Sequence, residues 1–172
     1  MTRTSINWLK SGMLAGALAL FGGNALAADP PATADVLNKL HASDQKEIQA
    51  GKTAEKEGQS KQVREYGKML VKDHTAADKK VTTLAKKEKI TLSTTQPGAE
   101  EMKNMPAAGS SFDDKFAREM VDDHKKDIAE VTEARDNTND PQLKKLLSDV
   151  LPTLQKHEDA AQKIVDSQAS QK

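Results

Sequence analysis

Three of the four histidines in this sequence stand where aliphatic residues would normally be expected. His74, His124 and His157 each continue a run of apolar residues at steps of three and four, the spacing of one buried helix face. Burying an imidazole without a hydrogen-bond partner is unfavourable, so such positions usually hold aliphatic side chains. These histidines are therefore the first candidates for a functional site.

Acidic residues accompany the histidines. Glu47 and Asp127 are candidate ligands beside the imidazoles, a donor combination that suits a first-row transition metal ion such as Fe, Zn, Cu or Mn. Asp44, Asp73 and Asp123 are candidates for supporting acceptors that fix the imidazole tautomers. The alternative for Asp73 and Asp123 is a place on a solvated helix face.

Helical periodicity identifies the elements that must position these side chains. No segment alternates with period two over the length of a strand, which predicts an all-α fold. Gly58, Ser60 and the pair Asp140-Pro141 are typical helix boundaries. The four predicted helices cover residues 33–57, 60–89, 112–137 and 141–167.

The lengths of the connections predict how the helices are arranged. The first and last connections are short, which predicts two antiparallel hairpins. Residues 90–111 are too many for a tight turn and could run along a whole helix. We therefore predict a long crossover loop and a ferritin-like four-helix bundle; the alternative is a flexible linker within an up-and-down bundle. Gly51 and Gly67 lie equally far from the first turn, which predicts a close helix contact.

This arrangement brings the candidate ligands to one level of the bundle. At about 1.5 Å per residue from the two turns, six of them fall within about 9 Å along the axis. They are Asp44, Glu47, His74, His124, Asp127 and His157. Two interpretations remain open: a metal site, or a histidine–carboxylate hydrogen-bond network that only fixes the packing of the core.

The N-terminus has the organisation of a secretory signal peptide. Arg3 and Lys10 precede a short apolar run, and a small-x-small cleavage motif ends at Ala27. The apolar run is too short to span a bilayer of about 30 Å, which disfavours the alternative of a retained membrane anchor. We expect cleavage of residues 1–27, a single mature domain over residues 28–172, and a periplasmic location.

The composition excludes several classes of protein. The chain has no cysteine, which excludes disulfides, thiolate zinc sites, iron–sulfur clusters and a cysteine nucleophile. After signal cleavage 24 basic residues face 26 acidic ones, a balance that does not favour binding to nucleic acid or stable membrane insertion. No phosphate loop, nucleophile elbow or zincin motif is found, so we do not predict an enzyme. The expected partners are another envelope protein or a second copy of the chain.

The chain resembles the exported bacterial family known as domain of unknown function 4142. The resemblance covers nearly all of the mature chain, and Glu47 also fits the family pattern. It rests on the stretches Lys68–His74, Phe112–Phe116, Met120–His124 and Leu151–His157. It implies a ferritin-like bundle and an envelope location, without an established activity.

The sequence departs from the pattern of di-iron ferritin-like enzymes. Those enzymes place a glutamate three residues before a histidine on two helices, whereas Val71 and Leu154 stand there in this chain. We therefore expect a mononuclear or storage-type site built from the three histidines and Glu47. The predicted function is metal binding in envelope stress or metal handling. The alternative is a non-catalytic structural or interaction protein of the envelope.

Overall fold

Four α-helices make up the fold in the computed structural model, which describes residues 32–93 and 112–170. Within these ranges no strand is found, which confirms the prediction of an all-α four-helix bundle. The predicted signal peptide and residues 94–111 of the predicted crossover loop lie outside the described residues. The helices are α1 (Thr33–Glu57), α2 (Lys61–Lys87), α4 (Phe112–Asn137) and α5 (Pro141–Ala169).

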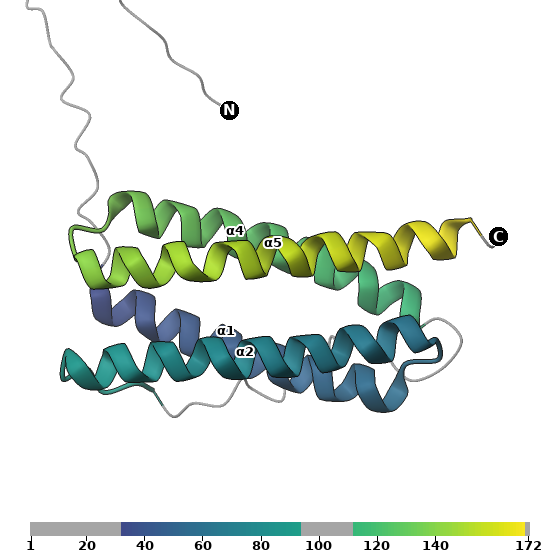
Figure 1. The fold of residues 1–172 in the computed structure, drawn as a ribbon, viewed down its shortest axis with the longest axis horizontal. Helices are drawn as coiled ribbons and strands as arrows, with labels where there is room; N and C mark the ends of the chain where they lie inside the picture. The colour runs from purple at the N-terminus through teal and green to yellow at the C-terminus, as the bar shows by residue number, and fades with distance from the viewer. Residues whose placement is uncertain (1–31, 94–111, 171–172) are drawn as a thin grey trace, which may run out of the picture.

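The helices form two pairs of antiparallel neighbours (Figure 1). Helix α1 packs mainly on α2, and α4 packs mainly on α5. Between the pairs, α2 contacts α5 more extensively than α1 contacts α4. Helices α2 and α4 run in the same direction (Figure 1). No helix in the described part of the chain has the length and apolar character needed to cross a membrane.

Polar side chains fix the turns that join the helices of each pair. Ser60 accepts a hydrogen bond from a backbone N–H in the first turn of α2, and Asp140 does the same for α5. These are the N-caps that the sequence predicts. The carboxylate of Asp113 in α4 accepts the backbone N–H groups of Gln59 and Ser60 at 2.8 and 2.7 Å. The first turn of α4 therefore fixes the turn between α1 and α2.

A close contact between two glycines brings α1 and α2 together near their shared turn. A Cβ atom on Gly51 would lie 2.7 Å from the carbonyl oxygen of Gly67. A Cβ atom on Gly67 would lie 2.5 Å from the carbonyl oxygen of Gly51. Both distances are too short for any larger residue without a backbone shift, so the predicted helix contact is confirmed.

The hydrophobic core consists of two clusters with a histidine layer between them. In α2, His74 lies between Leu70 of one cluster and Val81 of the other. His124 in α4 and His157 in α5 separate the same two clusters. The polar layer is therefore bounded by apolar packing along three of the four described helices.

Candidate metal centre

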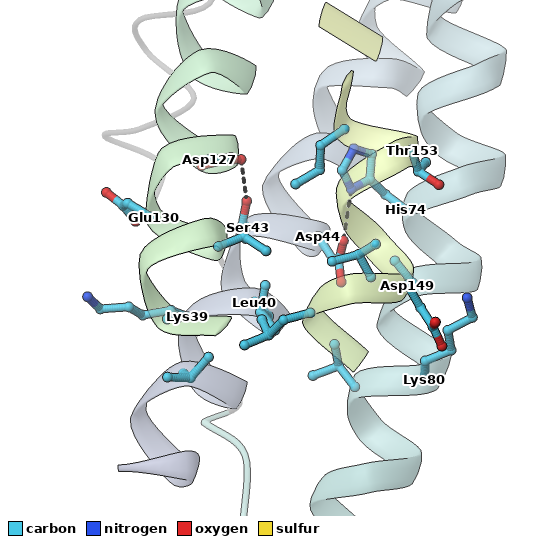
Figure 2. Close-up of a pocket in the computed structure, with 18 of the residues that line it drawn as sticks. Lys39, Leu40, Ser43, Asp44, His74, Lys80, Asp127, Glu130, Asp149 and Thr153 are labelled. Atoms are coloured by element: carbon cyan, nitrogen blue, oxygen red, sulfur yellow. Dashed lines mark hydrogen bonds and ion pairs between the residues drawn. The ribbon is translucent and has the colours of Figure 1, made fainter. Parts of the chain in front are cut away.

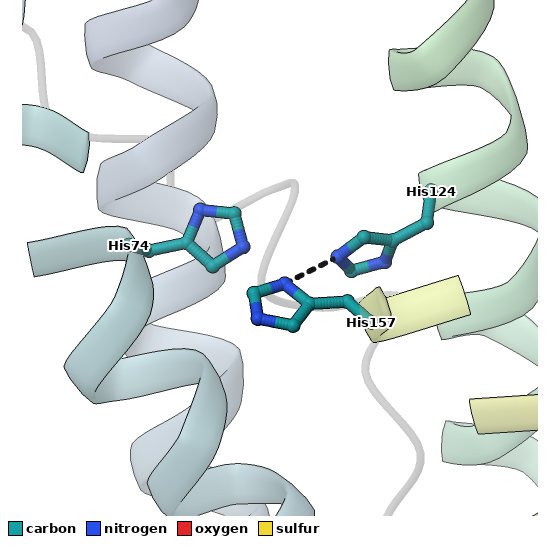
Figure 3. Close-up of side chains that lie close together, drawn as sticks. All are labelled: His74, His124 and His157. Atoms are coloured by element: carbon teal, nitrogen blue, oxygen red, sulfur yellow. Dashed lines mark hydrogen bonds between the residues drawn. The ribbon is translucent and has the colours of Figure 1, made fainter. Parts of the chain in front are cut away.

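The three predicted histidines meet in the core between the two helix pairs (Figure 3). One ring nitrogen of each lies within 4.8 Å of the other two. His74 is 3 % exposed, and His124 and His157 are fully buried. We call these residues the histidine triad. Because it takes one residue from α2, one from α4 and one from α5, it connects the two pairs.

The tautomer of His124 is set by the backbone of its own helix. Its Nδ1 lies 2.9 Å from the carbonyl oxygen of Met120, one turn earlier in α4. A carbonyl oxygen only accepts, so Nδ1 carries the ring proton and donates it. Burial lowers the pKa of His124 to about 3, so the ring is neutral at pH 7. Its Nε2 therefore has a free lone pair, which faces Nδ1 of His157 at 3.3 Å (Figure 3).

The tautomer of His157 is set by a carboxylate on another helix. Its Nε2 lies 3.2 Å from Oδ2 of Asp73 in α2. Although burial opposes the shift, hydrogen bonds from His157 and Lys156 lower the pKa of Asp73, so this carboxylate is ionised and accepts. Burial lowers the pKa of His157 to about 4, which leaves one ring proton at pH 7. With that proton on Nε2, the Nδ1 atom also has a free lone pair.

Two lone pairs therefore face each other across the contact between His124 and His157. Moving the proton of His157 to Nδ1 would satisfy His124, but it would turn a lone pair toward the carboxylate of Asp73. Neither neutral tautomer satisfies both neighbours. Two nitrogen ligands at about 2.0–2.1 Å from a tetrahedral Zn²⁺ lie roughly 3.3–3.4 Å apart. The observed 3.3 Å matches this separation, so a cation can replace the missing proton.

His74 completes the triad with an unpaired nitrogen. Its Nδ1 lies 2.8 Å from Oδ1 of Asp44 in α1. Its Nε2 is buried and has no hydrogen-bond partner among the described residues. Burial lowers the pKa of His74 to about 4, and burial together with Asp78 raises the pKa of Asp44 to about 8. When the ring proton lies on Nδ1, it is donated to Asp44, and Nε2 turns a lone pair toward the other two rings.

Two predicted ligands lie outside this group of nitrogen atoms. The structure does not bring a carboxylate oxygen of Glu47 or Asp127 within 4.8 Å of all three nitrogens. Glu47 is 1 % exposed, its Oε2 has no hydrogen-bond partner in the described part, and burial raises its pKa to about 8. Asp127 accepts a hydrogen bond from Ser43 at 3.1 Å and so connects α4 to α1.

The predicted supporting residues divide into two kinds. Asp44 and Asp73 each contact an imidazole of the triad, which is the role expected of them. Asp123 instead forms an ion pair of 2.7 Å with Lys46. Sequence reasoning missed the carbonyl group of Met120. The only signal for it was that it precedes His124 by one helical turn.

A cavity of about 770 Å³ lies beside the triad, between the two helix pairs (Figure 2). His74, Asp44 and Asp73 form part of its wall, so it reaches both supporting carboxylates. Figure 2 places the Ser43–Asp127 contact on one side of the cavity and the Asp44–His74 contact on the other. Much of the remaining wall is apolar: Val36, Leu40, Ala77, Val81, Val131, Leu147, Val150 and Leu154.

The fold and the site define a four-helix bundle with a buried three-histidine cluster. A family model described as Domain of unknown function (DUF4142) matches residues 22–164. The chain belongs to this family, as its motifs predict. Neither a curated protein nor a solved structure matches the chain.

Proposed function

We propose that the chain binds one divalent first-row transition metal ion through the histidine triad. The ligand atoms are Nε2 of His74, Nε2 of His124 and Nδ1 of His157. One observation carries the proposal: three buried ring nitrogens converge, while the second nitrogen of each ring has a hydrogen-bond partner outside the triad. This pattern of outer partners is typical of metal-ligating histidines.

The donor set favours zinc or copper among the metals expected from the sequence. Three imidazole nitrogens suit Zn²⁺ and Cu²⁺, whereas Mn²⁺ prefers carboxylate, carbonyl and water oxygens. Within the described residues no carboxylate belongs to the group of ligand atoms. Glu47 becomes a fourth ligand only if its side chain moves, and its unpaired Oε2 leaves it free of a competing hydrogen bond.

The biological setting is proposed from the sequence and the direction of the helices. The predicted signal peptide supports a periplasmic protein, and the parallel course of α2 and α4 supports a ferritin-like bundle. The nitrogen-rich site supports metal handling in the envelope rather than di-iron chemistry. Binding of one ion at a fully buried site is suited to retaining that ion.

The second candidate is a structural or interaction protein of the envelope. It is favoured by polar contacts that join the helix pairs without any metal. His157 contacts Asp73 between α5 and α2, and Lys46 contacts Asp123 between α1 and α4. In this case the triad only fixes how the pairs pack.

Metal content separates the two candidates. The protein is purified from the periplasm without an affinity tag, and its metal is measured by mass spectrometry before and after chelator treatment. If the triad binds a metal, we expect about one equivalent of Zn²⁺ or Cu²⁺ in the purified protein, or stoichiometric uptake on titration. His124→Ala should abolish uptake, whereas His41→Asn should retain it because His41 pairs with Asp78 outside the triad. Less than about one tenth of an equivalent, without uptake, supports the structural candidate.

A further inference from the structure

The inner wall of the cavity between the helix pairs is acidic. Six of the charged groups that line it belong to exposed residues and balance one another: Glu130, Glu133, Asp149, Lys39, Lys80 and Lys156. The other three are carboxylates of buried or half-buried residues, namely Asp44, Asp73 and Asp127. The interior of the cavity therefore carries excess negative charge, which attracts a cation and repels an anion.

Two of these inner carboxylates form no ion pair with a lysine or arginine in the described part of the chain. Asp73 accepts a hydrogen bond from Lys156 at 3.2 Å. Asp44 instead contacts the imidazole of His74, and Asp127 contacts the hydroxyl group of Ser43. Asp44 and Asp127 are therefore the groups whose charge a bound cation would compensate.

Asp44 also presents a free acceptor atom. The residue is 7 % exposed, and its Oδ1 lies 2.8 Å from Nδ1 of His74. Its Oδ2 has no hydrogen-bond partner among the described residues, and Figure 2 shows this oxygen turned away from His74. A largely buried carboxylate oxygen without a partner is unfavourable. An ammonium group would supply both the missing charge and up to three N–H donors.

The cavity continues from these carboxylates along an apolar wall. Its lining on α1 extends from Asp44 to Val36, which spans about 12 Å at about 1.5 Å per residue, the length of an extended chain of roughly eight carbon atoms. Val81, Val131 and Leu147 line it from the other three helices. These features suit a molecule with a cationic head and an apolar body.

We propose that the cavity binds a primary ammonium ion with an apolar tail. The ammonium group donates a hydrogen bond to Oδ2 of Asp44 and is attracted by Asp127, and the tail lies between the two helix pairs. This site is separate from the proposed metal site. Of the triad only His74 lines the cavity, and its Nε2 is buried.

Calorimetric titration with three small molecules tests the head and the tail. The chelator-treated protein is titrated at pH 8.5 with octylammonium, butylammonium and octanoate. This pH is above the value of about 8 to which burial raises the pKa of Asp44, so its carboxylate is ionised. Octylammonium should bind at least about tenfold more tightly than butylammonium, because four more methylene groups leave water. It should also bind at least about tenfold more tightly than octanoate, whose head has the opposite charge.

Each comparison can overturn one part of the inference. Equal affinity for octylammonium and octanoate would overturn the contact of the cationic head with the carboxylates. Equal affinity for the two ammonium ions would overturn the place of the tail. Absence of octylammonium binding would overturn the inference as a whole.

Carboxylate variants locate the head. Asp44→Asn should weaken octylammonium binding by at least about tenfold, because it removes the charge and one acceptor oxygen. Asp122→Asn makes the same change of charge on the exposed face of α4, outside the cavity wall, and should leave the affinity unchanged. If Asp44→Asn does not fold, Asp127→Asn tests the inner charge instead. Full affinity in a folded variant of the inner wall would overturn the inference.

Alanine variants locate the tail. Ala134→Trp fills the cavity and should weaken octylammonium binding by at least about tenfold. Ala129→Trp, at an exposed position of the same helix outside the cavity wall, should not. If Ala134→Trp does not fold, Ala77→Phe fills the cavity from α2. Unchanged octylammonium affinity in a folded cavity-filling variant would contradict the proposed binding site.

The two proposals fail separately. Protein that binds octylammonium but takes up neither Zn²⁺ nor Cu²⁺ would remove the metal site and support the cavity site. Protein that takes up metal but binds no octylammonium would keep the metal site and overturn the cavity site.

Discussion

The Nε2 atom of His124 lies 3.3 Å from the Nδ1 atom of His157, and each ring directs its proton away from the other. The protein thereby holds two lone pairs together in its core, where an unsatisfied polar atom is costly. Outer acceptors maintain this arrangement, and the nearby Nε2 of His74 has no partner among the described residues. The following predictions test what this arrangement does.

Replacement of His157 by leucine should abolish tight metal binding without destabilising the metal-free protein. The change removes one of two facing lone pairs, and Asp73 keeps its contact with Lys156. Thermal melts with chelator and then with Zn²⁺ or Cu²⁺ measure both effects. If metal raises the melting temperature of His157→Leu as much as that of the wild type, His157 is not a ligand. Destabilisation of the metal-free variant by about 1–3 kcal/mol would instead support a packing network.

Asp44→Asn should weaken metal affinity by about 10–100-fold without abolishing it, because Asp44 orients His74 without belonging to the triad. The matched control is Asp123→Asn. Asp123 directly precedes His124 in the sequence, but its carboxylate pairs with Lys46 and not with a histidine of the triad. Competition with a chromophoric chelator gives both affinities. Equal losses in the two variants would mean that the effect is general electrostatics rather than orientation of His74.

The metal-free protein should be less stable at pH 8 than at pH 6.5. Burial raises the pKa of Glu47 from 4.5 to about 8, so the folded state holds a proton that the unfolded state loses above pH 4.5. As the pH rises from 4.5 to about 8, Glu47 therefore lowers the free energy of unfolding, by about 1.4 kcal/mol per pH unit at most. Asp44, whose pKa burial also raises to about 8, acts in the same direction.

The triad has the opposite effect below pH 6.5. Burial lowers the pKa values of its histidines, so the unfolded state binds protons first and stability falls as the pH falls from 6.5 toward 4. Maximal stability is therefore expected near pH 6.5. Urea denaturation at a series of pH values measures the curve, and Glu47→Gln should reduce its decline above pH 6.5. A decline of the same slope in that variant would assign it to other groups.

Gly67→Ala should destabilise the fold by about 1–3 kcal/mol, because its Cβ would meet the carbonyl oxygen of Gly51 at 2.5 Å. Helix propensity alone predicts the opposite sign, a gain of about 1 kcal/mol. Chemical denaturation decides between them. Lys68→Ala, at the next and exposed position of α2, should change stability by less than about 0.5 kcal/mol.

The helices and the histidine layer could be predicted because both depend on local periodicity. Steps of three and four residues define a buried face, and Asp140 before Pro141 marks the start of a helix through its cap. Counting from the turns brings His74, His124 and His157 to one level because the rise of a helix is constant. None of these inferences needs the details of side-chain packing.

The partners of the acidic residues could not be predicted in the same way. Asp73 and Asp123 each directly precede a histidine, yet Asp73 contacts a histidine of another helix and Asp123 contacts a lysine. Successive residues on a helix point about 100° apart, so an Asp-His pair does not place the two side chains together. The cavity depends on how far the helix pairs separate, which the pattern of a single helix does not determine.

The triad takes one residue from the first helix pair and two from the second, and this division has a consequence for how the chain matures. An ion bound there would add a cross-link between two halves of the polypeptide that are covalently joined by a single connection. The binding energy of the ion would stabilise the fold only after both helix pairs had packed together. The supply of the metal would then set how long the newly made chain stays open to proteases.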